Sequence, residues 1–155
     1  RLVEKLLDKG YFVLLKNHGN LRETLNDHLK RYSDIYDNCY FLKKSINLVD
    51  ALNLADITFV TYPMTGLAQT FYQKKKTVLA SPNNLWNINK KMEPLVSELI
   101  NLGAYIDTSQ ENNFEVLTFS EYKNLFASEK VKKLVKKIYN LAFSYIEHGN
   151  KSFLK

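Results

Sequence analysis

The fold is decided by residues 55–80, which read ADITFVTYPMTGLAQTFYQKKKTVLA. The short apolar run at residues 57–60 is typical of a strand that is buried on both faces. A turn follows, and the spacing of apolar residues over 65–73 predicts a helix. A second apolar run at residues 77–80 predicts another strand. Strand, helix and strand in this order indicate a β-α-β unit with parallel strands and a right-handed crossover.

The same alternation continues on both sides of this unit. Upstream, apolar spacing and capping residues predict helices over 1–9, from Asn20 and over 49–54, and strands over 11–15 and 39–42. Downstream they predict a helix over 95–102, a strand over 104–106, a short helix capped by Ser120, and a long final helix over 128–148 capped by Ser128. We therefore expect an α/β fold: a Rossmann-like open parallel sheet of four or five strands, helices on both faces, and strands 11–15, 57–60 and 77–80 at its centre.

Length and composition fit one soluble globular domain. The chain has 155 residues, of which 45% are hydrophobic and 25% charged, and only five are Gly and three Pro. These proportions exclude a disordered or collagen-like chain. No signal peptide is visible, and no apolar run approaches the roughly 18 residues that a membrane span needs. Because the chain opens on Arg1 rather than Met, we expect residues 1–155 to be a fragment of a longer protein.

Metal and redox chemistry find little support in the residue types. The single cysteine, Cys39, lies in an apolar stretch and is expected to be a buried, inert thiol. No DxD-like metal motif and no nucleophile elbow is present, so we expect no metal and no cofactor. Asp107 and Glu111 are the nearest acidic residues after the expected fifth strand, and their polar neighbours favour a solvated loop.

The formal net charge of +6 is concentrated in two lysine clusters. Three lysines stand together at residues 74–76, and five more lie between Lys130 and Lys137. The simplest interpretation is a solvated turn and a solvated helix face. The lysines are not interleaved with exposed aromatic residues and no nucleic-acid motif is present, so we do not expect a nucleic-acid partner.

Ligands of open parallel sheets bind beyond the carboxyl ends of the strands, and this rule points to three loops. The first reads Lys16-Asn17-His18-Gly19. Lys16 and His18 can present positive or hydrogen-bonding groups to a phosphate, and His18 can act as an acid or base near neutral pH. A surface loop in which His18 has no role is the alternative. Residues 81–83 form another of these loops, after the strand at 77–80.

The remaining loop reads Thr61-Tyr62-Pro63-Met64-Thr65-Gly66. A strand ends here and a helix begins at Thr65 or Gly66. Free backbone N–H groups at a helix start favour an anion, Gly66 allows a phosphate to approach the backbone, and Thr65 adds a hydroxyl. The alternative is an ordinary Thr cap without a ligand.

Two segments resemble a recurring pattern of GT-B glycosyltransferases. Residues 55–69 are similar to the run in which Ala-Asp and an apolar strand lead to a turn with Ser or Thr, often Gly, and a helix. Residues 73–79 resemble the "Gly-Lys-Pro-Val" start of the next strand, and 12–19 resemble an apolar strand followed by Lys-x-His-Pro. The resemblance covers residues 1–85 and points to bacterial capsular-polysaccharide transferases, including the Kdo-transferase-like group, and to teichoic-acid glycerophosphotransferases.

The resemblance implies the C-terminal, donor-binding domain of such an enzyme. His18 would be catalytic, and Lys16, Thr61, Thr65, Gly66 and Gln69 would bind the donor. The sequence departs from the pattern at three positions: Gly19 replaces Pro, Lys75-Lys76 replaces Lys-Pro, and Gln69 replaces an acidic residue that often contacts the donor.

The implied partners are a CMP-, CDP- or UDP-linked donor and the N-terminal GT-B domain, which holds the acceptor. Residues 1–155 alone are then expected to be catalytically inactive, whereas the parent would transfer sugar or a glycerol-phosphate-like unit for surface polysaccharide synthesis. The expected location is cytoplasmic, with peripheral contact at the inner face of the membrane left open. A stand-alone flavodoxin-like binding or regulatory module without catalytic activity is the alternative; a receiver domain is not, because the first strand ends without a phosphoacceptor Asp.

Overall fold

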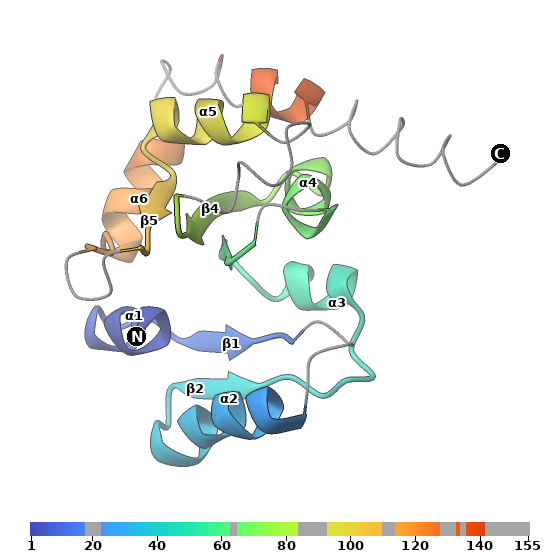
Figure 1. The fold of residues 1–155 in the computed structure, drawn as a ribbon, viewed down its shortest axis with the longest axis vertical. Coiled ribbons are helices and arrows are strands. Elements are labelled where there is room, and N and C mark those ends of the chain that lie inside the picture. The colour runs from blue at the N-terminus through green and yellow to red at the C-terminus, as the bar shows by residue number, and fades with distance from the viewer. Residues whose placement is uncertain are drawn as a thin grey trace, which may run out of the picture. The chain divides into compact units, whose positions relative to one another are not determined.

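The chain folds as two compact α/β units, Arg1–Ala55 and Asp56–Lys155. The computed structural model describes residues 1–17, 23–62, 65–83, 93–109, 114–127, 133 and 136–141 (Figure 1). Every strand pairing in these residues is parallel, with two strands in the first unit and three in the second. The predicted α/β class with parallel strands is therefore confirmed, and each unit is described by itself below.

The first unit alternates helix and strand. Its elements are α1 (Leu2–Asp8), β1 (Val13–Leu15), α2 (Glu23–Ile35), β2 (Cys39–Phe41) and α3 (Leu48–Asn53). β1 and β2 pair with Val13 opposite Cys39. Helix α1 ends at Gly10, whose φ of 79° is a backbone conformation that glycine adopts without steric cost. Asn47 caps α3 by accepting a hydrogen bond from the Asp50 backbone N–H at 2.9 Å.

Cys39 is buried in this unit, with 2% of its surface exposed. The sequence-based expectation of a buried thiol is confirmed. Burial raises the pKa of the Cys39 thiol, because the charged thiolate is poorly solvated there. A raised pKa keeps the thiol protonated at neutral pH and lowers its reactivity.

The second unit is built on a three-stranded sheet. Its elements are β3 (Ile57–Val60), α4 (Thr65–Tyr72), β4 (Lys76–Ser81), α5 (Glu93–Leu102), β5 (Tyr105–Asp107) and α6 (Phe119–Ala127). The strand order is β3-β4-β5, with Val60 opposite Leu79 and Ser81 opposite Asp107. Residues 136–141 are helical as well.

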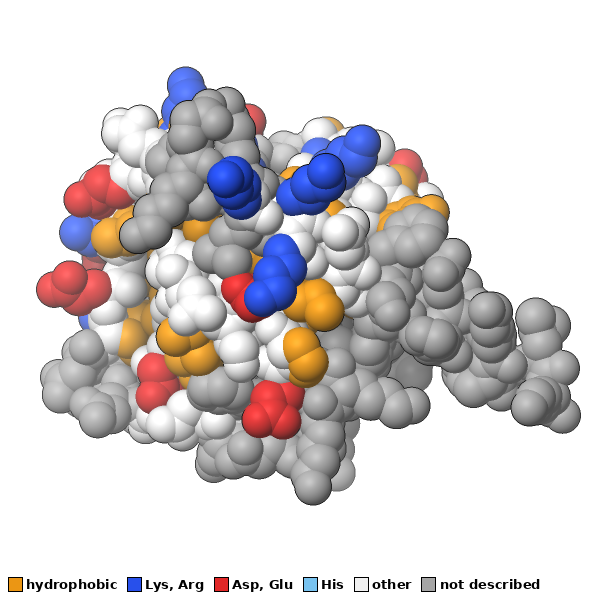
Figure 2. All heavy atoms as spheres, turned by 90° about the horizontal axis from the view of Figure 1, so that it is seen from above, with side chains coloured by type: hydrophobic (Ala, Val, Ile, Leu, Met, Phe, Trp, Pro, Cys, Tyr) orange, Lys and Arg blue, Asp and Glu red, His pale blue; other side chains and the backbone are white. Residues whose placement is uncertain are grey.

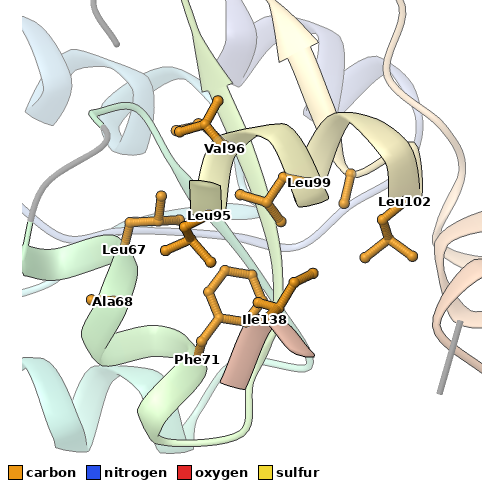
Figure 3. Close-up of a cluster of buried hydrophobic side chains, with 10 residues drawn as sticks. Leu67, Ala68, Phe71, Leu95, Val96, Leu99, Leu102 and Ile138 are labelled. Carbon is orange, nitrogen blue, oxygen red and sulfur yellow. The ribbon is translucent and has the colours of Figure 1, made fainter. Parts of the chain in front are cut away.

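Helices cover both faces of this sheet. On one face, α4, α5 and residues 136–141 enclose a cluster of buried apolar side chains, in which Phe71 lies beside Ile138 and Val60 packs at the margin (Figure 3). On the other face, the Phe59 ring meets the Tyr122 ring of α6 edge-on, with centroids 5.6 Å apart. Phe59 and Val60 are neighbours in β3 and point to opposite faces, because side chains alternate along a strand.

The element boundaries lie within two or three residues of the sequence predictions, with two corrections. Helix α6 begins after Thr118, not after Ser120, because Thr118 and Glu121 cap the helix reciprocally. Asp107 belongs to strand β5 and not to a solvated loop. The cap positions Asn20 and Ser128 lie outside the described residues, as does most of the expected final helix; its described part, 136–141, is helical. Among the described residues the five strands form a two-stranded and a three-stranded parallel sheet. The single sheet of four or five strands stays a prediction.

Candidate functional site at the carboxyl edge of the three-stranded sheet

Three strand ends meet at one edge of the second unit. Because β3, β4 and β5 are parallel, their carboxyl ends lie on the same side of the sheet. Thr61 and Tyr62 follow β3 and are exposed, Pro82 and Asn83 follow β4, and β5 ends at Asp107. Helix α4 starts at Thr65, five residues after the end of β3, so its amino end lies at this edge too.

Asp107 ties two of these strand ends together. Its Oδ1 accepts hydrogen bonds from the backbone N–H of Ser109 at 2.9 Å and of Asn83 at 3.3 Å. Burial by itself raises the pKa of the Asp107 carboxyl, but the bonds from Ser109 and Asn83 outweigh it and hold that pKa below its usual value. Asp107 is therefore a carboxylate at neutral pH, held in place at the sheet edge.

Ser81, at the end of β4, has a buried hydroxyl without a hydrogen bond. The residue has no exposed surface, and its Oγ finds no partner within the part of the chain that the structure describes. Its carbonyl oxygen is used, because it accepts from the Tyr105 hydroxyl at 3.0 Å and from the Thr108 N–H at 3.2 Å. A buried hydroxyl left unsatisfied costs roughly 1–3 kcal/mol. The Ser81 Oγ is thus a polar group at the edge that a ligand or water would satisfy.

The first turn of α4 is exposed at Gly66. A Cβ added there would meet no atom within 4 Å. Its φ is not in the left-handed region, so neither packing nor backbone conformation requires glycine here. Gln69, one turn later, is partly buried, and its carbonyl oxygen accepts from the Gln73 N–H at 3.0 Å inside the helix. Thr61, Gly66 and Gln69 therefore belong to one strand-turn-helix segment, as does the backbone of Thr65.

The other predicted loop belongs to the first unit. Lys16 follows β1, and its Nζ donates to the carbonyl oxygen of the adjacent Asn17 at 3.3 Å. This is a weak local contact, which leaves the ammonium group able to exchange it for an anion. His18 and Gly19 lie outside the described residues. That the loop at residues 16–19 contributes to the same site as the start of α4 stays a prediction.

Sequence reasoning missed Asp107. The polar residues that follow it resemble a solvated loop, and only the pairing of Asp107 with Ser81 places it at the sheet edge. Its position directly after an apolar strand could have identified Asp107 as a candidate, because the same position identified Lys16 and Thr61.

Metal ligands and membrane helices were also sought in the described residues. Nowhere among them do three His, Cys, Asp or Glu side chains gather closely enough to hold a metal ion. None of the helices in these residues combines the length and apolar character needed to cross a membrane. Comparison with protein-family models, with curated proteins and with solved structures found no match.

Proposed function

We propose that this chain is the donor-binding half of a GT-B-type glycosyltransferase that acts in bacterial surface polysaccharide synthesis. The donor is a CMP-, CDP- or UDP-linked sugar or a glycerol-phosphate-like unit. Its phosphates would lie at the start of α4, against Thr65 and Gly66, with Lys16 and His18 supplied by the loop after β1. The observation that carries the proposal is that the amino end of α4 and three parallel strand ends lie at one edge.

The proposal includes a single open sheet of five strands. Among the described residues, β1 has a strand partner on one side only, and so has β3. An unpaired strand edge exposes backbone donors and acceptors, which proteins usually cover or pair. The sequence-based expectation of one parallel sheet with residues 11–15, 57–60 and 77–80 at its centre corresponds to the order β2-β1-β3-β4-β5. That order has β1, β3 and β4 at the centre and brings the loops after β1 and β3 to one edge.

Three features of the sheet edge support a nucleotide-linked ligand. Gly66, in the first turn of α4, is exposed, and the space beside its Cα is empty, so a phosphate can approach the chain at this position. Asp107 is a fixed carboxylate, suited to accept hydrogen bonds from sugar or ribose hydroxyls. The Ser81 hydroxyl lacks a partner within the described residues. In the family pattern an acidic residue at the position of Gln69 often contacts the donor. Asp107 is a further candidate for that contact with a hydroxyl of the donor.

Catalysis in this scheme needs a second domain. GT-B chemistry holds the donor on one domain and the acceptor on the other, and the rate depends on positioning both. We expect the 155-residue chain to bind donor without turnover, and His18 to act only when the acceptor domain is present.

A flavodoxin-like binding module is the second candidate. The strand order β2-β1-β3-β4-β5 that the single-sheet expectation implies is also the order of flavodoxin-like folds. In that case the ligand would be a flavin mononucleotide or a regulatory phosphate compound, and no transferase activity would follow in any context.

The test is amide chemical-shift mapping of the chain with CMP, CDP, UDP and flavin mononucleotide. We expect a nucleoside diphosphate to shift residues 61–66, 81–83 and 107–109 together with 16–18. His18→Ala should weaken its binding about tenfold, because a hydrogen bond to a charged group contributes roughly 1.5–3 kcal/mol. His28→Ala is the matched control, because His28 is an exposed histidine on α2. It should leave the affinity unchanged.

Three outcomes would contradict the proposal. Nucleotide shifts confined to the amino ends of the strands would show that the site is misplaced. Saturable binding of flavin mononucleotide alone at the carboxyl edge would favour the flavodoxin-like module. Full transferase turnover by the isolated chain would contradict the division of the site between two domains.

A further inference from the structure

A small pocket lies at the opposite, amino end of the second unit's sheet. Its volume is about 150 Å³, and its walls come from Phe71, Lys74, Lys75, Lys76, Phe126 and Tyr139. Three lysines from the α4–β4 turn form one side, and aromatic residues of α4, α6 and the helix at 136–141 form the rest. Lys76 is the first residue of β4, so the pocket lies at the other end of the strand from Ser81 and Asp107.

The described part of the chain places no carboxylate in an ion pair with the lysines of this pocket, Lys74, Lys75 and Lys76. The nearby helix at 136–141 adds exposed Lys136, one turn before Tyr139, whereas Lys137 is paired with Glu98 of α5. Figure 2 shows Lys and Arg side chains gathered on the face that carries α5 and residues 136–141. An anion is the ligand that such a pocket attracts.

Lys74 has a backbone conformation that residues other than glycine rarely adopt. Its φ is 56°, in the left-handed region that glycine usually occupies at a helix end. The Lys74 N–H donates to Phe71 at 2.8 Å and the Lys75 N–H donates to Thr70 at 2.9 Å, the bonding of a Schellman cap. A lysine at this position is strained, whereas glycine would not be.

The size of the pocket and the residues of its walls limit which ligands it can bind. Its volume of about 150 Å³ is well below the roughly 300 Å³ or more of sites that enclose a whole small molecule. One phosphate group fits inside, and the rest of a larger molecule such as a nucleotide would lie outside. The Phe71 and Tyr139 rings, with centroids 6.3 Å apart, form an apolar wall that strengthens attraction between charges. Burial raises the pKa of Tyr139, so its hydroxyl is protonated and can donate.

We propose that this pocket binds a phosphate monoester, with Lys74, Lys75 and Lys76 neutralising the dianion and the rest of the molecule lying outside. Lysine is a point-charge ligand for phosphate, and three lysines on one side match a group with several charged oxygens. The ester can come from a soluble compound or from the headgroup of an anionic lipid. The inference does not depend on the donor site at the other end of the strands.

The soluble source is tested by titrating the 155-residue chain with inorganic phosphate and with glycerol 3-phosphate, followed by amide and aromatic chemical shifts. We expect saturable shifts at residues 74–76, 126 and 139, with a Kd on the order of 1 mM or tighter. Added salt should weaken the binding, since the Debye length falls from about 10 Å at 0.1 M to about 3 Å at 1 M.

A variant that preserves the fold tests the lysines. Lys74→Gly combined with Lys75→Gln removes two charges, and glycine adopts the left-handed conformation at 74 freely. Binding should weaken about tenfold or more. The matched control is Lys43→Gln with Lys44→Gln, two consecutive exposed lysines in the first unit. The control carries the same change of net charge and should bind phosphate as the parent chain does.

The lipid source is tested by sedimentation with vesicles of phosphatidylcholine containing phosphatidic acid, a monoester, or phosphatidylserine, a diester. Two results support the pocket: binding of soluble phosphate, and binding to phosphatidic acid vesicles but not to phosphatidylserine vesicles. In either case the binding must be lost in Lys74→Gly/Lys75→Gln and kept in the control variant. Equal losses in both variants, equal binding to phosphatidylserine vesicles, or no binding to any of these probes would overturn the proposal.

Discussion

Asp107 is the residue whose role is clearest from its contacts. One carboxylate oxygen accepts from two backbone N–H groups, those of Asn83 after β4 and Ser109 after β5. Such bonds stabilise the charged form and align the two strand ends. Replacing Asp107 by Ala leaves both N–H groups without this acceptor. We predict that the free energy of unfolding falls by about 1–2 kcal/mol at neutral pH, measured by chemical denaturation.

The pH dependence of this effect has a definite sign. The folded-state pKa of Asp107 is depressed, so its stabilisation is complete above the unfolded value of about 3.9 and is lost as the pH falls through the lower folded value. The difference between the parent and Asp107→Ala should therefore shrink in acid. Asp107→Asn keeps an acceptor oxygen, so it should lose less stability and show no such pH dependence. A constant difference between the parent and Asp107→Ala from pH 7 to pH 2 would contradict this account.

Among the elements, α6 has the clearest local determinant. The Thr118 Oγ1 accepts from the Glu121 N–H at 3.3 Å, and the Glu121 carboxylate accepts from the Thr118 N–H at 2.7 Å. This reciprocal arrangement is a capping box, and it satisfies two donors at the start of the helix. The helix carries Tyr122 into the face opposite α4 and α5, so its start matters for packing.

Thr118→Ala should lower the free energy of unfolding by about 1 kcal/mol, since loss of a capping side chain usually has this effect. Ser120→Ala is the matched control, because Ser120 is exposed and lies inside the helix, where alanine is at least as favourable. The free energy of unfolding of both variants is measured by urea denaturation and compared with that of the parent chain. An equal or larger loss for Ser120→Ala would show that the helix begins at Ser120 after all.

At the scale of the whole molecule, the proposed five-stranded sheet predicts cooperative unfolding. Leu99 of α5 has no exposed surface, and Leu99→Ala should lower the stability of the second unit by about 2–5 kcal/mol. If β1 pairs with β3, amide hydrogen exchange in β1 should accelerate in this variant as much as exchange in β4. Leu54→Ala is the control, because the Leu54 side chain is 62% exposed, and it should change neither rate. Unchanged exchange in β1 of Leu99→Ala would show that the two sheets are independent.

The sequence by itself determined the order and type of the elements. Apolar runs at 57–60 and 77–80 and the apolar spacing of residues 65–73 are local patterns, and strand and helix periods differ enough to be read from a short window. Parallel pairing followed as well, because a strand-helix-strand segment returns the chain to the same edge. The burial of Cys39 was predictable from its apolar neighbours for the same reason.

Only the tertiary structure decided which distant residues meet. Asp107 lies beside Ser81 and Asn83 because β4 and β5 pair in one register, and no local pattern specifies a register. The sequence indicated a solvated turn at lysines 74–76. In the structure these lysines line a pocket together with Phe126 and Tyr139, which come from helices far away in the sequence. Such contacts depend on packing across the whole unit, where many weak interactions between residues far apart in sequence select one arrangement.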